Sequence, residues 1–170
     1  MKLAIGSDHA GLHLKKRILE LLKHKDVTVT DFGTEKDESV DYPDFGMQVA
    51  EAVSHGEVER GILLCGSGIG MSIVANKYRG VRAALCYDTQ TARLSRQHNN
   101  ANVLVMGGRL LEASQAMEIV KIWLETKFEG GRHARRIQKI VEIEKNNMNH
   151  RDVTPKKNKT KAKRPNKAET

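Results

Sequence analysis

The chain has 170 residues, of which 39% are hydrophobic, and its formal net charge is +8 at pH 7. This length suits one domain, no apolar run approaches the roughly 18 residues of a membrane-spanning helix, and the N-terminus lacks a signal-peptide pattern. Two cysteines without an export signal indicate free thiols in a reducing, cytoplasmic compartment. Together, the cysteine count, the lack of a long apolar run and the hydrophobic content disfavour a disulfide scaffold, a membrane protein and a fully disordered chain.

Short apolar strands alternate with amphipathic helical patterns through most of the chain. In chain order the patterns predict strand 2–6, helix 14–22, strand 27–31, helix 45–54, strand 61–65, helix 71–77, strand 82–86, helix 89–97, strand 103–106, helix 113–124 and a last helix around 137–141. This alternation predicts an α/β fold with a five-stranded parallel sheet covered on both faces. In such sheets ligands bind outside the carboxyl ends of the strands. That rule selects the loops at 7–11, 32–42, 65–70, 87–88 and 107–109.

The positive charge is concentrated at the C-terminus. Residues 145–170 hold nine of the 29 basic residues and two of the 21 acidic residues, a net charge of +7, which leaves +1 for the rest of the chain. Apolar periodicity also stops near residue 146, and a Lys-rich segment with little to bury is expected to be disordered. The sequence therefore predicts a globular domain over 1–146 and a basic tail over 147–170 that can bind polyanions nonspecifically.

The most informative motif is Cys65-Gly-Ser-Gly-Ile-Gly70, between a predicted strand and a predicted helix. Alternating glycines let backbone amides approach an anion, and a helix N-terminus adds partial positive charge. The loop could therefore bind a phosphate or stabilise an enediolate, and the alternative is a tight strand-to-helix turn. A dinucleotide fingerprint would need glycine where Met71 stands, and the P-loop sequence is absent.

Several residues near the predicted ligand edge could transfer protons. A Cys65 thiolate could act as base or nucleophile, although most unpaired cysteines are core residues, as we expect for Cys86. Asp8 and His9 follow the first strand, and His98 ends a helix just before the fifth. Each histidine alone suits a surface or capping role. We expect His9 and His98 to lie together near the glycine loop. In that place a role in proton transfer is as well supported as a surface or capping role.

A basic cluster follows Gly130-Gly131 near the C-terminus. Arg132 and Arg136 are four residues apart and share a helix face, and two guanidinium groups on one face suit a phosphate dianion. The alternative is that this face is simply solvated. A solvated position is also what we expect for Arg135. The His and Cys residues lack the short spacings of zinc sites, so no metal site is predicted.

Taken together, these segments resemble the type B ribose-5-phosphate isomerases of the ribose/galactose isomerase family. The matching strings occur in order over residues 1–146 and leave out the tail: Gly6–Gly11, Asp41–Pro43, Cys65–Gly70, Ala75–Lys77, Ser95–Asn99 and Glu129–His133. One branch of that family has a Glu base where this chain has Met71, so the resemblance places the chain in the branch with a Cys base.

The resemblance implies a Rossmann-like three-layer sandwich that interconverts D-ribose 5-phosphate and D-ribulose 5-phosphate through an enediolate. It implies no metal or organic cofactor, and a homodimer or tetramer with active sites at the subunit boundary. A hexose 6-phosphate, such as allose or galactose 6-phosphate, is the near alternative as substrate. A non-catalytic protein that binds sugar phosphates and RNA is the alternative from a different class.

By position, the resemblance gives Cys65 the role of proton-shuttling base and His98 that of ring-opening acid, with Ser67 assisting at the enediolate. Arg132 and Arg136 would bind the phosphate from the partner subunit. The full set of implied substrate contacts is Asp8, His9, Tyr42, Gly66, Gly68, Ile69, Gly70, Asn99, Arg109, Arg132 and Arg136.

Overall fold

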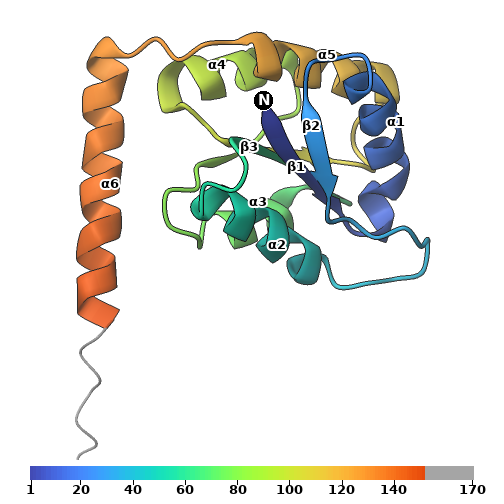
Figure 1. Cartoon of the computed structure of the whole chain (residues 1–170), viewed down its shortest axis with the longest axis horizontal. Coiled ribbons are helices and arrows are strands. Elements are labelled where there is room, and N and C mark those ends of the chain that lie inside the picture. The colour runs from blue at the N-terminus through green and yellow to red at the C-terminus, as the bar shows by residue number, and fades with distance from the viewer. Residues whose placement is uncertain (152–170) are drawn as a thin grey trace, which may run out of the picture.

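Five parallel strands form the centre of the structure, a computed structural model that describes residues 1–151, with side chains for residues 1–147 (Figure 1). The strands lie in the order β2-β1-β3-β5-β4. They are β1 (Lys2–Ser7), β2 (Thr28–Asp31), β3 (Arg60–Cys65), β4 (Ala83–Leu85) and β5 (Val103–Gly107). The helices are α1 (Leu12–Leu22), α2 (Tyr42–Ser54), α3 (Ile69–Ala75), α4 (Thr89–Asn99), α5 (Ala113–Glu125) and α6 (Gly131–Arg151), with a short 3-10 turn, η1 (His9–Gly11).

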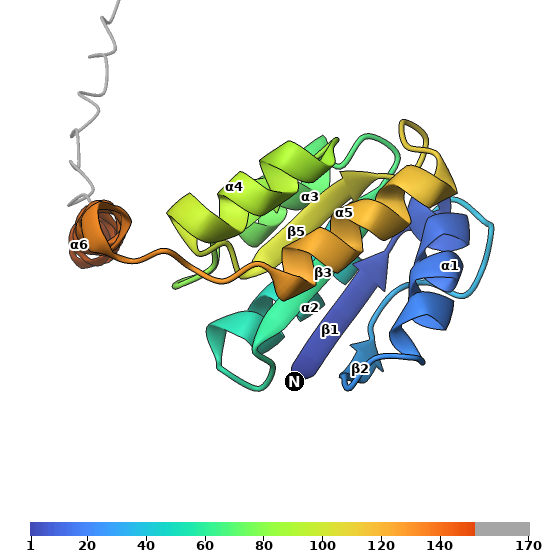
Figure 2. The same cartoon turned by 90° about the horizontal axis from the view of Figure 1, so that it is seen from above.

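Helices cover both faces of the sheet, as the alternation of elements predicts (Figure 2). Alternate strand residues point to opposite faces, so Leu3 and Ile5 pack against α1, α4 and α5, whereas Ala4 packs against α2 and α3. The side chain of Trp123 on α5 is fully buried in the first of these two cores. The predicted three-layer α/β sandwich is therefore confirmed.

Helix α2 begins earlier than the apolar pattern predicts. It starts at Tyr42, three residues before the expected Phe45, with Pro43 in its first turn. Proline suits this position because its fixed φ matches the helix and its missing N–H would have no partner there. The early start brings Tyr42 onto the edge of the sheet that carries the candidate site.

Helix α6 extends away from the sandwich on the linker that follows α5 (Figure 1). It continues to Arg151, five residues past the predicted domain boundary at 146, because helix formation does not require the apolar periodicity that marks packing. Ile140 and Ile143 on this helix are 48% and 59% exposed. The rest of the predicted tail, residues 152–170, lies outside the described residues.

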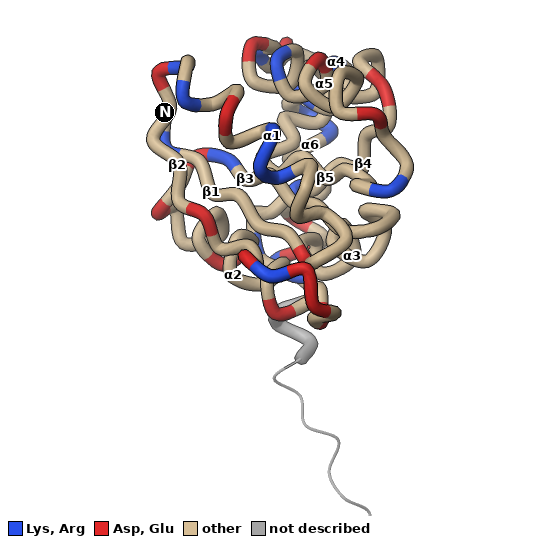
Figure 3. Tube along the Cα trace, turned by 90° about the vertical axis from the view of Figure 1, so that its right-hand side faces the viewer, with Lys and Arg blue, Asp and Glu red and all other residues tan. Residues whose placement is uncertain are grey.

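Basic and acidic residues are interspersed over the body of the molecule (Figure 3), as its near-neutral net charge implies. None of the helices within residues 1–151 combines the length and the apolar character needed to cross a bilayer.

Candidate active site

The carboxyl ends of three neighbouring strands bring the first set of predicted site residues together. Ser7 at the end of β1 pairs in register with Leu64 on β3, and Cys65 pairs with Gly107 on β5. The amide of Gly108 then donates to the Cys65 carbonyl at 2.7 Å. This edge carries what we call the glycine-loop group, which comprises Asp8, His9, Tyr42, Cys65, Gly66, Ser67, Gly68, Ile69, Gly70 and Arg109.

Close packing of backbone fixes the shape of the glycine loop. Gly68 has φ +81°, and a Cβ there would lie 2.5 Å from Leu85 Cδ1 and 3.0 Å from the carbonyl carbon of Met106. A side chain at this position would therefore be both strained and obstructed. The resulting turn directs the Gly68 amide at Cys65 Sγ, 3.1 Å away, and the Ile69 amide at Ser67 Oγ, 3.3 Å away. The nearly buried sulfur of Cys65 thus accepts a backbone amide of the glycine loop.

The two cysteines lie in different surroundings, and the expectation that Cys86 is a core residue is confirmed. The Cys86 thiol is buried in the core between the sheet and α4. This burial raises the pKa of the thiol to about 11. Such a thiol is an unreactive core group at neutral pH. Cys65, in contrast, lies at the mouth of the glycine loop, with its sulfur accepting the Gly68 amide.

The neighbours of the loop are held by their own hydrogen bonds. Asp8 is 6% exposed, and its Oδ1 accepts the Gly11 amide at 3.0 Å. His9 Nδ1 accepts the Val40 amide at 3.2 Å, so the proton of the neutral ring resides on Nε2, which remains able to donate. The ring of Tyr42 packs against the backbone of Gly70, where a Cβ would lie 2.5 Å from Tyr42 Cζ.

Arg109 completes this side of the site. Its amide donates to the Gly66 carbonyl at 3.0 Å, and its side chain crosses the same glycine, with Cδ 3.5 Å from where a Gly66 Cβ would be. The Arg109 side chain thus lies beside the backbone of the glycine loop.

His98 lies at the opposite edge of the sheet. Helix α4 starts directly after β4 and ends just before β5, so it runs against the strand direction (Figure 2). His98, the second-last residue of α4, therefore lies at the amino ends of the strands. Cys65 lies at the carboxyl end of β3, and a six-residue strand spans about 20 Å. The expectation that His98 lies near the glycine loop of the same chain is therefore wrong, because a residue that precedes a strand belongs to that strand's amino edge.

At this second edge, His98 joins residues of the linker and of α6 in what we call the histidine–arginine group: His98, Asn99, Glu129, Arg132, His133 and Arg136. The rings of His98 and His133 stack with centroids 4.2 Å apart and an interplanar angle of 1°. Glu129 Oε2 lies 3.9 Å from His98 Nε2 and 3.7 Å from His133 Nε2, while Arg132 Nε donates to His133 Nε2 at 3.3 Å.

A buried arginine holds the end of α4 against the linker. Arg96 is 6% exposed and donates to the carbonyls of Ala101 and Thr126 and to Asn100 Oδ1. Burial, followed by the positive charges of nearby arginines, lowers its pKa to about 10, so it stays charged at neutral pH. The Glu129 amide also donates to the carbonyl that precedes His98, at 3.1 Å. These bonds place His98 beside Glu129.

Sequence reasoning did not assign functions to Glu129 and His133. Their spacing of four residues was the available signal, and the stacking partner His98 comes from a distant helix. His98, Glu129 and His133 offer ligand atoms that all lie within 4.8 Å of one another, close enough to hold a divalent ion. The neighbouring Arg132 and Arg136 oppose a cation and suit an anion such as phosphate, so this group fits an anion better than a metal.

Comparison with known proteins shows which family this chain resembles. The family model described as Ribose/Galactose Isomerase matches residues 3–140. Ribose-5-phosphate isomerase B of Escherichia coli (strain K12) is 48% identical over 143 residues, which cover 84% of this chain and 96% of that protein. D-erythrulose-4-phosphate isomerase of Pectobacterium atrosepticum is 45% identical over 141 residues, with 82% and 93% covered.

A solved structure of ribose-5-phosphate isomerase B from Mycoplasma genitalium, with bound ribulose-5-phosphate, superposes on this chain with a TM-score of 0.82. The two sequences are 47% identical, and the match covers 85% of this chain and 96% of that one.

The buried His133 should make stability depend on pH. Burial, then the positive charges of His98 and Arg132, lower its pKa below the ordinary value of 6.5. The folded state then binds fewer protons at His133 than the unfolded chain, so the stabilising contribution is complete above about pH 6.5 and is lost as the pH falls through the lowered pKa. Between pH 7 and pH 5 the thermal midpoint of His133→Gln should fall less than that of the parent. His24→Gln, at an exposed site, serves as control, and an unchanged pH profile in His133→Gln would contradict this assignment.

Proposed function

This chain belongs to the ribose/galactose isomerase family, and we propose that it interconverts D-ribose 5-phosphate and D-ribulose 5-phosphate through an enediolate. The observation that carries the proposal is Cys65, whose sulfur accepts the Gly68 amide of the glycine loop at the carboxyl edge of the sheet. Aldose–ketose isomerisation needs a base, an oxyanion site, a ring-opening acid and a phosphate anchor. The glycine-loop group can supply the base and the oxyanion site. The histidine–arginine group can supply the ring-opening acid and the phosphate anchor.

In the proposed mechanism, the Cys65 thiolate removes the proton from C2 of the open-chain aldose. The C2–H electrons form the C1–C2 double bond, and the negative charge moves to the carbonyl oxygen on C1. Amides of Gly66–Gly70, with Ser67, stabilise that oxygen, and Asp8, His9 and Arg109 hold the sugar. The thiol then returns the proton to C1 while the proton of the C2 hydroxyl passes to the negatively charged oxygen on C1, which leaves the ketose with its carbonyl at C2. No electrons are exchanged with a cofactor, and a reducing, cytoplasmic setting would keep the thiol free.

Ring opening and phosphate binding belong to the second group. His98 acts as the acid that protonates the ring oxygen, Asn99 beside it contacts the sugar, and Arg132 and Arg136 pair with the phosphate dianion. Since this group lies across the sheet from Cys65, we propose a homodimer in which the histidine–arginine group of one copy completes the glycine-loop group of the other. A tetramer built from such dimers would contain the same site.

Exposed apolar side chains support this pairing. Ile69 and Ile73 on α3, next to the glycine loop, are 52% and 55% exposed. A groove of about 520 Å³ separates α6 from the body and is lined in part by Ile140, Ile143 and Asn99. Exposed isoleucines at both candidate half-sites are what a self-complementary interface between two copies requires. A second copy is therefore the occupant we assign to these faces.

The decisive assay offers the purified chain a panel of sugar phosphates in the presence of EDTA. We expect kcat/KM to be highest for ribose 5-phosphate, ahead of erythrulose 4-phosphate and of allose and galactose 6-phosphate. Cys65→Ala should lower kcat by about 10²–10⁴-fold, as expected for loss of a general base, while Cys86→Ala stays near the parent. A higher kcat/KM for a hexose phosphate would overturn the substrate assignment, and full activity in Cys65→Ala would overturn the role of the thiol.

The basic tail is proposed to be an addition that catalysis does not need. The family model matches residues 3–140 and ends before the tail, and residues 152–170 carry seven Lys and Arg against two acidic residues. Ending the chain at residue 151 should leave kcat/KM within about twofold and should abolish salt-sensitive binding to RNA. Loss of catalysis on truncation would contradict this view. RNA binding by a full chain without isomerase activity would instead favour a non-catalytic binding protein.

A further inference from the structure

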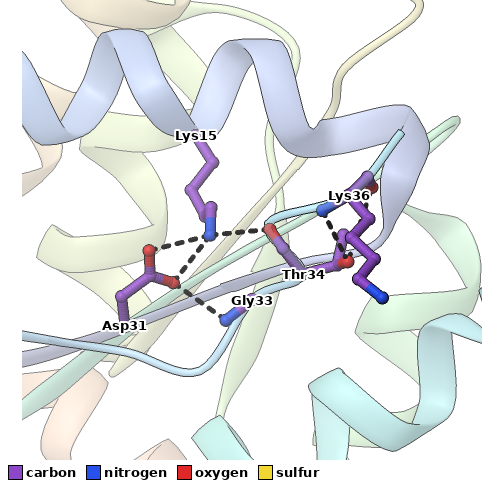
Figure 4. A network of polar contacts seen from close by, with 5 residues as sticks. All are labelled: Lys15, Asp31, Gly33, Thr34 and Lys36. Atoms are coloured by element: carbon purple, nitrogen blue, oxygen red, sulfur yellow. Dashed lines mark hydrogen bonds and ion pairs between the residues drawn. The ribbon is translucent and has the colours of Figure 1, made fainter. Parts of the chain in front are cut away.

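A lysine is buried beneath the loop that borders the glycine-loop group (Figure 4). The Lys15 side chain on α1 is 2% exposed. Its Nζ donates to Asp31 Oδ2 at 2.7 Å, to Asp31 Oδ1 at 3.0 Å and to the Thr34 carbonyl at 3.0 Å. A buried ammonium is costly unless its protons are paired, and here three acceptors take them. Lys15 therefore has no proton left for a substrate, and its role must be exerted through its partners.

These partners fix the start of the loop over residues 32–40. Asp31 Oδ1 also accepts the Gly33 amide at 2.8 Å. The Thr34 amide donates to the Ser7 carbonyl at 2.9 Å, one residue before Asp8. A Cβ at Gly33 would lie 2.6 Å from the Ser7 amide nitrogen and 2.9 Å from Lys15 Cδ, so the loop backbone is pressed between the strand end and the lysine.

The far end of the same loop touches the candidate active site. The Val40 amide donates to His9 Nδ1, and α2 begins two residues later with Tyr42, whose ring packs on Gly70. Between these ends residues 35–39 are exposed. An exposed pair between His13 and Asp37, 3.6 Å apart, bridges this stretch to α1 and stabilises it little. Val40 is therefore held between two fixed points, the anchor at Lys15 on one side and the start of α2 on the other.

We propose that Lys15 is a positioning residue for the isomerase reaction. Its ammonium locks the loop over 32–40, so that the Val40 amide holds His9 with its proton on Nε2 and Tyr42 stays against Gly70. The link to turnover rests on the proposed function, whereas the control of the His9 ring does not. Lys15 contacts neither the substrate nor Cys65 in this account.

The test compares Lys15→Met with Lys16→Met, its exposed neighbour on α1, well below their unfolding temperatures. Lys15→Met should raise KM for ribose 5-phosphate about tenfold, as expected for the loss of one or two substrate hydrogen bonds, with a smaller fall in kcat because Cys65 is untouched. Nitrogen-15 NMR should show the His9 ring averaging between two tautomers, and amide exchange should speed up over residues 32–40. Lys16→Met should match the parent in every readout.

A double variant separates positioning from stability. Lys15→Met/Asp31→Leu replaces the ion pair by apolar side chains, a change that commonly restores stability. It should regain much of the thermal midpoint yet keep the raised KM and the averaged His9 signal, because the Thr34 carbonyl and the Gly33 amide still lack their partners. If Lys15→Met fails to fold, this double variant carries the test alone. A parental KM and a single His9 tautomer in the double variant would overturn the proposal.

The readouts also distinguish this proposal from the proposed function. The His9 spectrum and the amide exchange need no substrate. A parent chain without isomerase activity, combined with a changed His9 signal in Lys15→Met, would refute the function and support the positioning role. An active parent chain, combined with an unchanged His9 signal and an unchanged KM in Lys15→Met, would support the proposed function and refute the positioning role.

Discussion

Parallel strands impose the constraint on which the rest of this structure depends. Each connecting helix must return against the strand direction, so residues at strand ends and residues at helix ends lie on opposite edges of the sheet. Cys65 ends a strand and His98 ends a helix. A single copy of this fold therefore keeps the thiol and the imidazole at opposite edges, and the proposed function calls for a second copy to complete the site. The projecting α6 and the exposed isoleucines on α3 and α6 are consistent with that requirement.

Close backbone approach is the second determinant, and it acts at the carboxyl edge. The glycine loop lies directly on the end of β5, where a Cβ at Gly107 would come within 2.9 Å of the Ser67 carbonyl oxygen. That contact, together with the left-handed turn at Gly68, directs the Gly68 amide at the Cys65 sulfur. On the other side of the edge, the pairing of Lys15 with Asp31 presses the 32–40 loop onto β1. Polar groups of the site are thus positioned by backbone fixed on both sides.

Sequence patterns predicted the strands and the glycine loop because both depend on local chemistry: apolar runs, turn residues and glycine spacing. The edge rule then correctly grouped Asp8 with Cys65, since both follow strands. That rule does not select His98, and the separate expectation that His98 lies near the glycine loop is wrong because His98 precedes β5 and so lies at the other edge. Apolar periodicity describes one element at a time and does not indicate contacts between different elements. The sequence therefore did not predict the contacts of His98 with His133 and of Lys15 with Asp31. Helix α6 was predicted too short, because its end carries no apolar stripe to mark it.

The measurement that tests the shared site most directly mixes two inactive variants, Cys65→Ala and His98→Ala, and follows activity as their subunits exchange. If each site combines Cys65 of one copy with His98 of the other, half of the randomly paired dimers are mixed, and each mixed dimer holds one intact site. Activity should then rise to about a quarter of the parent value. Mixed dimers verified by native mass spectrometry that stay as inactive as the two variants alone would contradict the account.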